Sequence, residues 1–198
     1  MTVSRETDER LCQYEALLRR WNAKINLVSP NDMVMLNSRH IQDCLQLSEL
    51  APGDVDHWAD LGSGGGLPGL IVAFARAHLK TKFTLVESDQ RKAAFLRQVT
   101  RETHLKNVAV LAQRIETAEP LAADIVSARA LAPLPKLMPY LARHLSPTGR
   151  AFLLKGRQWQ AELREAQDKW DFLWAAHPSR TDDEAAVLEI SRVSYGPK

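Results

Sequence analysis

Cysteine is scarce in this chain, which holds only Cys12 and Cys44 among its 198 residues. Two thiols are too few for a disulfide framework, and they lack the spacing of a metal site. The apolar runs fall far short of the roughly 20 residues that a membrane span needs. The polar stretch from Thr2 to Arg10 does not have the form of a secretory signal. We therefore expect a cytoplasmic protein in a reducing compartment, with no bound metal and no membrane segment.

Net charge is low as well, because 26 Lys and Arg residues against 24 Asp and Glu residues leave only +2. Such a balance does not by itself predict a nucleic-acid binder. The 45% of hydrophobic and 25% of charged residues are ordinary for a globular protein. A chain of this length can bury a sizeable core in one domain and still carry an appendage.

Glycine is also sparse, with nine residues in all, but five of them fall within Gly62–Gly69. An apolar run that ends at Asp60-Leu61 precedes this cluster, and a second apolar run, Leu67 to Ala77, follows it. This order predicts a strand, a glycine-rich turn and a helix, with Pro68 near the first helical position. Glycines let the backbone approach a ligand closely, and the free N–H groups of a helix start favour a carboxylate or phosphate. The cluster therefore predicts a small-molecule site.

Two helical segments precede the glycine cluster, over residues 4–21 and about 32–50, and the break Ala51-Pro52-Gly53-Asp54 follows them. We therefore divide the chain into a helical N-terminal appendage, residues 1–50, and a main domain, residues 51–198. Past the break, strands and helices alternate. We expect strands at 55–61, 83–87, 108–111, 124–127, 150–156, 171–176 and 185–193, and helices at 67–78, 90–104, 131–145 and 158–169, with a short helix from Glu116.

This alternation predicts an α/β fold with a mostly parallel sheet and helices on both faces. Only a loop joins the last two strands, so the final strand must be antiparallel. Ligands of such sheets bind beyond the carboxyl ends of the strands, where the glycine cluster lies. Glu87 ends the second strand at about the spacing, roughly 20 residues past the glycines, of an acid that binds ribose hydroxyls.

Two nucleoside ligands are compatible with these features, a dinucleotide and S-adenosylmethionine. The stretch Gly64 to Gly69 matches the pattern G-x-G-x-x-G of dinucleotide sites, but that pattern is weak when it stands alone. Glu87 supports a nucleoside without choosing between the two ligands. The short chain and the final strand pair without a helix favour S-adenosylmethionine.

The stretch Asp60 to Gly66 resembles the first motif of class I methyltransferases, whose sheet is Rossmann-like. Together with further motifs, it makes the chain similar to the RsmG (GidB) family, bacterial methyltransferases that act on guanine N7 in 16S ribosomal RNA. Cys44 stands where Ser is usual in the family. The motifs follow family order over nearly the whole chain: Trp21-Asn22 with Asn26-Leu27, His40-Ile41-Gln42-Asp43-Cys44-Leu45, Asp60 to Gly69, Val86-Glu87-Ser88 with Phe95-Leu96, Ser127-Ala128-Arg129-Ala130, and Leu154-Lys155-Gly156.

The resemblance implies S-adenosylmethionine as cofactor and 16S ribosomal RNA, or the small ribosomal subunit, as partner, and we expect a monomer. The glycine turn and the strand-end acid supply two expected cofactor contacts, Gly64 and Glu87. The resemblance adds five more: Gly62, Leu67, Ile115, Glu116 and Arg129.

Guanine N7 has a free lone pair and releases no proton when it is methylated, so the reaction requires no general base. Positioning of the two reactants can supply roughly 7–11 kcal/mol. No acid–base pair is apparent in the sequence, and Arg129 and Lys155 are the candidates for an active-site role. Basic residues near strand ends, Arg114, Lys155 and Arg157, are the candidates for contact with RNA.

Each candidate also has a plainer interpretation. Lys155 is equally compatible with an ordinary cation at a strand end, and His40 and Asp43 with a buried structural pair. For the whole protein, two other functions stay open. One is a module that binds S-adenosylmethionine or a nucleoside without catalysis, and the other is a small NAD-linked reductase.

Overall fold

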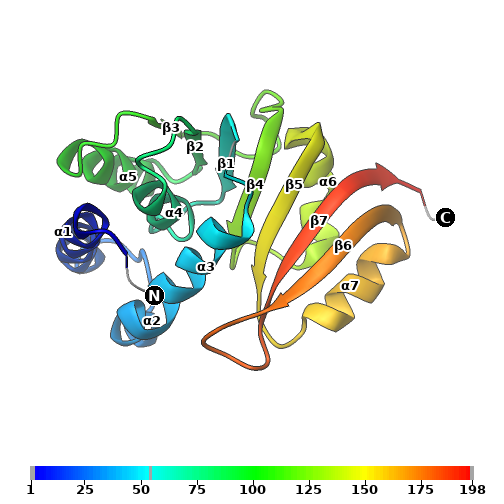
Figure 1. Cartoon of the computed structure of the whole chain (residues 1–198), viewed down its shortest axis with the longest axis horizontal. Helices are drawn as coiled ribbons and strands as arrows, with labels where there is room; N and C mark the ends of the chain where they lie inside the picture. The colour runs from blue at the N-terminus through cyan, green and yellow to red at the C-terminus, as the bar shows by residue number, and fades with distance from the viewer. Residues whose placement is uncertain (1–2, 54, 197–198) are drawn as a thin grey trace.

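A computed structural model of the chain describes residues 3–53 and 55–196. Its strands form one seven-stranded sheet in the order β3-β2-β1-β4-β5-β7-β6 (Figure 1). Neighbours from β3 to β5 are parallel, whereas β7 is antiparallel to both β5 and β6. The mostly parallel sheet with an antiparallel final strand is thus confirmed. The strands are β1 His57–Leu61, β2 Lys82–Val86, β3 Val108–Leu111, β4 Ala123–Arg129, β5 Leu145–Lys155, β6 Trp170–Pro178 and β7 Ala186–Tyr195.

Helices cover both faces of this sheet (Figure 1), as expected. On one face, α1, α3, α4 and α5 share a single cluster of buried apolar side chains, and on the other face α6 and α7 share a second cluster. None of the described helices is both long and apolar enough to cross a membrane. The helices are α1 Arg5–Asn22, α2 Pro30–Val34, the π-helix η1 Leu36–Ile41, α3 Gln42–Leu50, α4 Gly69–Ala75, α5 Gln90–Glu102, α6 Leu134–His144 and α7 Trp159–Gln167.

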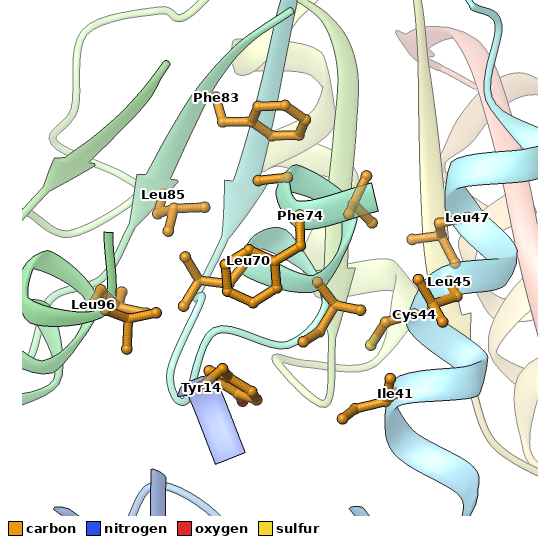
Figure 2. Close-up of a cluster of buried hydrophobic side chains, with 14 of the residues drawn as sticks. Tyr14, Ile41, Cys44, Leu45, Leu47, Leu70, Phe74, Phe83, Leu85 and Leu96 are labelled. Carbon is orange, nitrogen blue, oxygen red and sulfur yellow. The ribbon is translucent and has the colours of Figure 1, made fainter. Parts of the chain in front are cut away.

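The N-terminal helices bury their apolar stripes against the helices of the main sheet. Figure 2 shows Tyr14 of α1 and Ile41 at the end of η1 beside Leu70 and Phe74 of α4. Tyr14 is fully buried, and its hydroxyl donates to the carbonyl oxygen of Gly65 at 2.6 Å. The N-terminal segment therefore holds the glycine turn in place through this hydrogen bond.

Three predicted helices are wrong in their details. Pro68, expected near the first helical position, precedes the helix after a cis peptide bond, and α4 spans Gly69–Ala75 in place of the expected residues 67–78. The short helix expected from Glu116 is a turn, because side chains of α6 engage the carbonyl groups of Ile115 and Ala118. Likewise, the predicted helix over residues 32–50 consists of three pieces, α2, η1 and α3.

Candidate functional site

The glycine turn between β1 and α4 has positive φ angles, which residues with a side chain rarely adopt. Gly62, Gly64 and Gly66 have φ values of 68°, 53° and 90°. A Cβ at Gly66 would lie 2.4 Å from a methyl carbon of Leu70, and one at Gly62 would lie 2.6 Å from Leu131. The backbone N–H of Gly62 donates to the carbonyl oxygen of Val86 at 2.9 Å, which fixes the turn at the end of β2. Glycine is therefore required here by conformation and by space.

A cavity of about 490 Å³ opens above this turn, at the carboxyl ends of β1, β2 and β4. Its volume falls in the range of small-molecule sites, roughly 300–1,000 Å³. The structure brings all seven predicted cofactor residues together on its wall: Gly62, Gly64, Leu67, Glu87, Ile115, Glu116 and Arg129. We call this space the first cavity. Contact of these residues with a cofactor stays a prediction.

Glu87 is held rigidly on the wall of the first cavity, with only 8% of its surface exposed. One carboxylate oxygen accepts from the N–H of Gly64 at 2.8 Å, and the other accepts from the N–H of Asp89 at 2.8 Å. A carboxylate has about four acceptor positions, so each oxygen keeps capacity for one more donor. This arrangement suits a pair of ribose hydroxyls.

The turn that carries Ile115 and Glu116 is fastened to α6 at several points. The imidazole of the buried His144 donates through Nε2 to the carbonyl oxygen of Ile115 at 2.9 Å. Burial lowers the pKa of His144, which keeps the ring neutral near pH 7. The hydroxyl of Tyr140 donates to the carboxylate of Glu116 at 2.5 Å. Side chains of α6 therefore hold this wall of the first cavity in place.

Asp60, the acid of the glycine motif, supports the site from within the sheet. It is fully buried, and one carboxylate oxygen accepts from the hydroxyl of Ser127 at 2.6 Å. That hydroxyl accepts in turn from the indole N–H of Trp58 at 2.9 Å. Burial raises the pKa of Asp60 to about 6, although the hydrogen bond from Ser127 opposes the shift. Asp60 therefore ties β1 to β4 beneath the turn, and it does not line the first cavity.

Arg129 ends β4 and takes part in a relay of three side chains. Its guanidinium donates to Nδ1 of His40, and Nε2 of His40 lies 2.8 Å from a carboxylate oxygen of Asp32. Because Nδ1 accepts, the ring must carry its proton on Nε2 and donate it to Asp32. Burial, followed by the charge of Arg129, lowers the pKa of His40 despite the opposing charge of Asp32. His40 is therefore a neutral acceptor that orients Arg129.

The chain reaches this relay through an irregular segment. Asn22 turns the chain, since its side-chain oxygen accepts from the N–H groups of Leu27 and Val28 at 2.8 and 3.0 Å. His40 lies in the π-helix η1, a conformation that often occurs at functional sites. His40 and Asp43, for which a structural pair was one interpretation, contact different partners instead.

The basic RNA candidates are placed quite differently from one another. The side chain of Lys155 is only 8% exposed, and its Nζ lies 2.6 Å from a carboxylate oxygen of Glu162. It also donates to the carbonyl oxygen of Ala132 at 2.9 Å. Arg114 is exposed and lines the first cavity, whereas Arg157 is exposed outside it. Lys155 is thus engaged with the protein itself.

Sequence reasoning missed the residues that hold these groups in place: Tyr14, Asp32, His144 and Glu162. Tyr14 and His144 act on residues far away along the chain, whereas Asp32 lies eight positions before His40 and Glu162 lies seven positions after Lys155. For Asp32 a local signal existed, because Ser29 and Asp32 form the cap of α2. The other three left no pattern in the sequence.

Comparison with known proteins gives consistent results. A family model described as "GidB: rRNA small subunit methyltransferase G" matches residues 7–183. The ribosomal RNA small subunit methyltransferase G of Paracoccus denitrificans is 53% identical over 98% of this chain and 100% of its own length. That of Gluconobacter oxydans is 50% identical, over 96% of each chain.

Solved structures share the fold at low sequence identity. The structure of MtNAS in complex with S-adenosylmethionine is similar with a TM-score of 0.61, at 16% identity over 96% of this chain and 76% of that chain. An S-adenosylmethionine-dependent methyltransferase from Aquifex aeolicus gives a TM-score of 0.60, at 14% identity over 89% of this chain and 97% of that chain. These likenesses place the seven-stranded sheet among class I methyltransferase folds.

Proposed function

Since the chain belongs to the rRNA small subunit methyltransferase G family, we propose that it transfers a methyl group from S-adenosylmethionine to N7 of a guanine in 16S ribosomal RNA. The observation that carries this proposal is the state of the titratable groups on the wall of the first cavity. Glu87 accepts from Gly64, Glu116 accepts from Tyr140, and His40 lies between Arg129 and Asp32. These three candidate proton acceptors are each hydrogen-bonded within the protein, which suits a reaction that removes no proton.

The residues of the first cavity fit the cofactor. A Cβ at Gly62 would lie against Leu131, which also lines the cavity, so the glycine keeps the backbone of the turn open there. Glu87 keeps acceptor capacity for ribose hydroxyls, and Ile115 offers an apolar surface for a purine ring. When bound, S-adenosylmethionine supplies an electrophilic methyl group whose sulfur leaves as a neutral thioether.

The protein's own contribution is to orient the acceptor base. The lone pair of guanine N7 forms the new N–C bond while the electron pair of the C–S bond returns to sulfur, so no proton is transferred. Arg129 stands at the boundary of the first cavity, and its orientation depends on His40. Holding the reactants in line can contribute roughly 7–11 kcal/mol to the rate enhancement.

The target RNA is proposed to be the free 16S ribosomal RNA or the small ribosomal subunit, and the protein to act as a cytoplasmic monomer. Arg114, at the mouth of the first cavity, and the exposed Arg157 are the proposed contacts to phosphates. Such contacts hold register and carry no sequence information.

Methyl transfer to 16S ribosomal RNA from a strain that lacks this modification tests the proposal. Purified protein with labelled S-adenosylmethionine should modify one guanine, and mass spectrometry of the digested RNA should place the methyl group on N7. Isothermal titration with S-adenosylhomocysteine should show binding that Glu87→Ala weakens by about 10-fold or more. Binding without transfer would leave a non-catalytic module, and a methyl group on another atom would refute the N7 assignment.

A further inference from the structure

A second cavity of about 500 Å³ lies beside the first. The two share the four residues of the segment Arg129–Ala132, which follows β4. The remaining wall comes from the ends of β5 and β7, from α7 and from the helical segment that carries Arg39 and Asp43. A space of this size, roughly 300–1,000 Å³, suits a nucleotide or another small molecule.

Two of the three cations on this wall, Arg39 and Lys155, form ion pairs. Arg39 forms an ion pair with Asp182, and Lys155 forms one with Glu162 at 2.6 Å. Arg129 donates to His40. Arg39 and Lys155 are therefore neutralised by acids, whereas Arg129 has no acidic partner among the described residues and its buried Nη1 makes no hydrogen bond.

Asp43 is a hydrogen-bond acceptor on the same wall, and part of its hydrogen-bonding capacity is unused. Its residue is only 8% exposed, and its Oδ1 accepts from the hydroxyls of Ser179 at 3.0 Å and Thr181 at 2.6 Å. Within residues 3–53 and 55–196, no hydrogen bond engages its other oxygen, Oδ2. A carboxylate only accepts hydrogen bonds, so the second cavity offers an acceptor to a ligand that carries N–H donors.

Guanine is the RNA base whose donors match this acceptor. Its N1–H and its exocyclic N2 amine are adjacent donors on the Watson–Crick edge, whereas no other RNA base has two adjacent donors there. Its N7 lies on the major-groove edge, and O6 lies between N1 and that edge. A guanine whose N1 and N2 face Asp43 therefore directs N7 away from Asp43. The segment Arg129–Ala132 lines both cavities and therefore forms the wall between them.

We propose that the second cavity receives the target guanine, taken out of the RNA stack, and that Asp43 accepts from its N1–H and N2 amine. Enzymes that modify a base inside RNA or DNA commonly read the extruded base on this edge. The inference rests on the proposed function and deepens it, because it names the residue that selects guanine. The loop that carries Ser179 and Thr181 orients the carboxylate of Asp43.

Asp43→Asn tests the assignment with little change in shape. The amide can still accept from Ser179 and Thr181, but it turns a donor toward the donors of guanine. We expect kcat/KM for unmodified 16S ribosomal RNA to fall by about 10- to 100-fold, with the Kd for S-adenosylhomocysteine within twofold of wild type. Thr181→Val and Gln46→Ala are the matched controls, because each loosens the same loop and keeps the carboxylate. They should stay within about threefold of wild type.

A change in the RNA gives a second test that does not depend on the folding of a variant. Inosine at the mapped target position, introduced by splinted ligation of 16S ribosomal RNA, lacks only the N2 amine and keeps N7. The wild-type protein should lose about 10-fold in kcat/KM on this RNA, and Asp43→Asn should lose little more.

The outcomes separate the two proposals. If the wild-type protein transfers nothing to unmodified 16S ribosomal RNA, the proposed function fails. If it transfers to guanine but methylates inosine equally well, or if Thr181→Val loses as much activity as Asp43→Asn, the assignment of Asp43 is overturned.

Discussion

At the scale of single residues, His40 is the group whose protonation should change the site. In the neutral ring Nδ1 accepts from Arg129, whereas a protonated ring carries an N–H at that position and repels the guanidinium. The charged groups around it are Arg129 and Arg39, which oppose protonation, and Asp32, which favours it. Burial and Arg129 prevail, so the pKa of His40 lies below the ordinary value of 6.5.

The lowered pKa of His40 determines how both stability and activity change with pH. The unfolded chain binds a proton at His40 more readily than the folded chain, so the stability that the neutral ring contributes is present above pH 6.5 and is lost as pH falls through the lowered pKa. Methyl transfer should fall over the same range, because Arg129 loses its acceptor. We expect an acid limb in the pH profile of kcat/KM, with a midpoint below pH 6.5.

The variant His40→Gln should lack that limb, because an amide oxygen can accept from Arg129 at any pH. Its activity at pH 8 should be about 2- to 10-fold below wild type. The exposed His78 provides a control, and His78→Gln should keep the limb. An unchanged acid limb in His40→Gln would show that another group causes it.

At the same scale, the residues of the site could be predicted from the sequence where the signal was local. The glycine turn and Glu87 follow from motif spacing within about 30 residues, and the structure gathers them around one cavity. The partner of Arg129 could not be predicted in this way. His40 lies 89 positions from Arg129, and only the folded sheet brings them together.

At the scale of elements, the glycine turn gives a sharp contrast between two substitutions. A Cβ at Gly66 would lie 2.4 Å from Leu70, and the φ of Gly66 is 90°. Gly53 has no atom within 4 Å of its would-be Cβ. We expect Gly66→Ala to lower the free energy of unfolding by about 1–3 kcal/mol and to abolish measurable binding of S-adenosylhomocysteine.

The matched variant Gly53→Ala should leave the free energy of unfolding within about 0.5 kcal/mol of wild type and binding intact. Urea denaturation and isothermal titration measure the two effects. Equal behaviour of the two alanine variants would mean that the turn can rearrange without cost.

The pair Lys155–Glu162 fastens α7 to the segment that follows β4. Lys155 donates to Ala132, and Glu162 accepts from the backbone N–H of Leu134 at 2.8 Å. Lys155→Met leaves a partly buried carboxylate without its cation, and it should cost about 3 kcal/mol of unfolding free energy. The double variant Lys155→Met/Glu162→Gln should recover most of this loss, because the amide oxygen can still accept from Leu134.

Turnover of the double variant then decides what Lys155 does. If Lys155 acts by holding the segment, the double variant should recover activity together with stability. If the double variant is stable but inactive on RNA, Lys155 contacts the substrate as the sequence suggested.

Strand positions were predictable because alternating apolar strands and helices leave a clear pattern. The ends of helices were harder to predict, because contacts with other elements determine where a helix begins and ends. The turn at Glu116 is one example, since Arg143 donates to the carbonyl oxygen of Ala118 at 2.7 Å and His144 donates to that of Ile115. Hydrogen bonds from α6 thus occupy carbonyl groups of a segment that its sequence alone allowed to be helical.

At the scale of the whole molecule, the N-terminal segment and the C-terminal hairpin enclose the second cavity together. Asp43 of α3 accepts from Ser179 and Thr181 in the loop between β6 and β7, and Gln46 of α3 donates to the carbonyl oxygen of Pro178 at the end of β6. Arg180 of that loop forms an ion pair with Glu49. Segments from both ends of the chain are therefore needed to complete one site.

The N-terminal helices also complete the core. Tyr14, Leu17 and Leu18 of α1 lie in one buried cluster with Phe74 of α4 and Phe95 of α5. A fragment of residues 51–198 would expose this face of the sheet and its helices. We therefore expect the fragment to unfold without a cooperative transition and to show no binding of S-adenosylhomocysteine, because the glycine turn also loses the hydrogen bond from Tyr14.

Supplying residues 1–50 as a separate chain should restore both properties in part, since the lost contacts are noncovalent. Differential scanning calorimetry and isothermal titration on the fragment, with and without the N-terminal peptide, measure the effect. A fragment that melts cooperatively and binds S-adenosylhomocysteine with the wild-type Kd would show that residues 1–50 form a true appendage. In that case the division of the chain at residue 50, proposed from the sequence, would hold for the folded molecule as well.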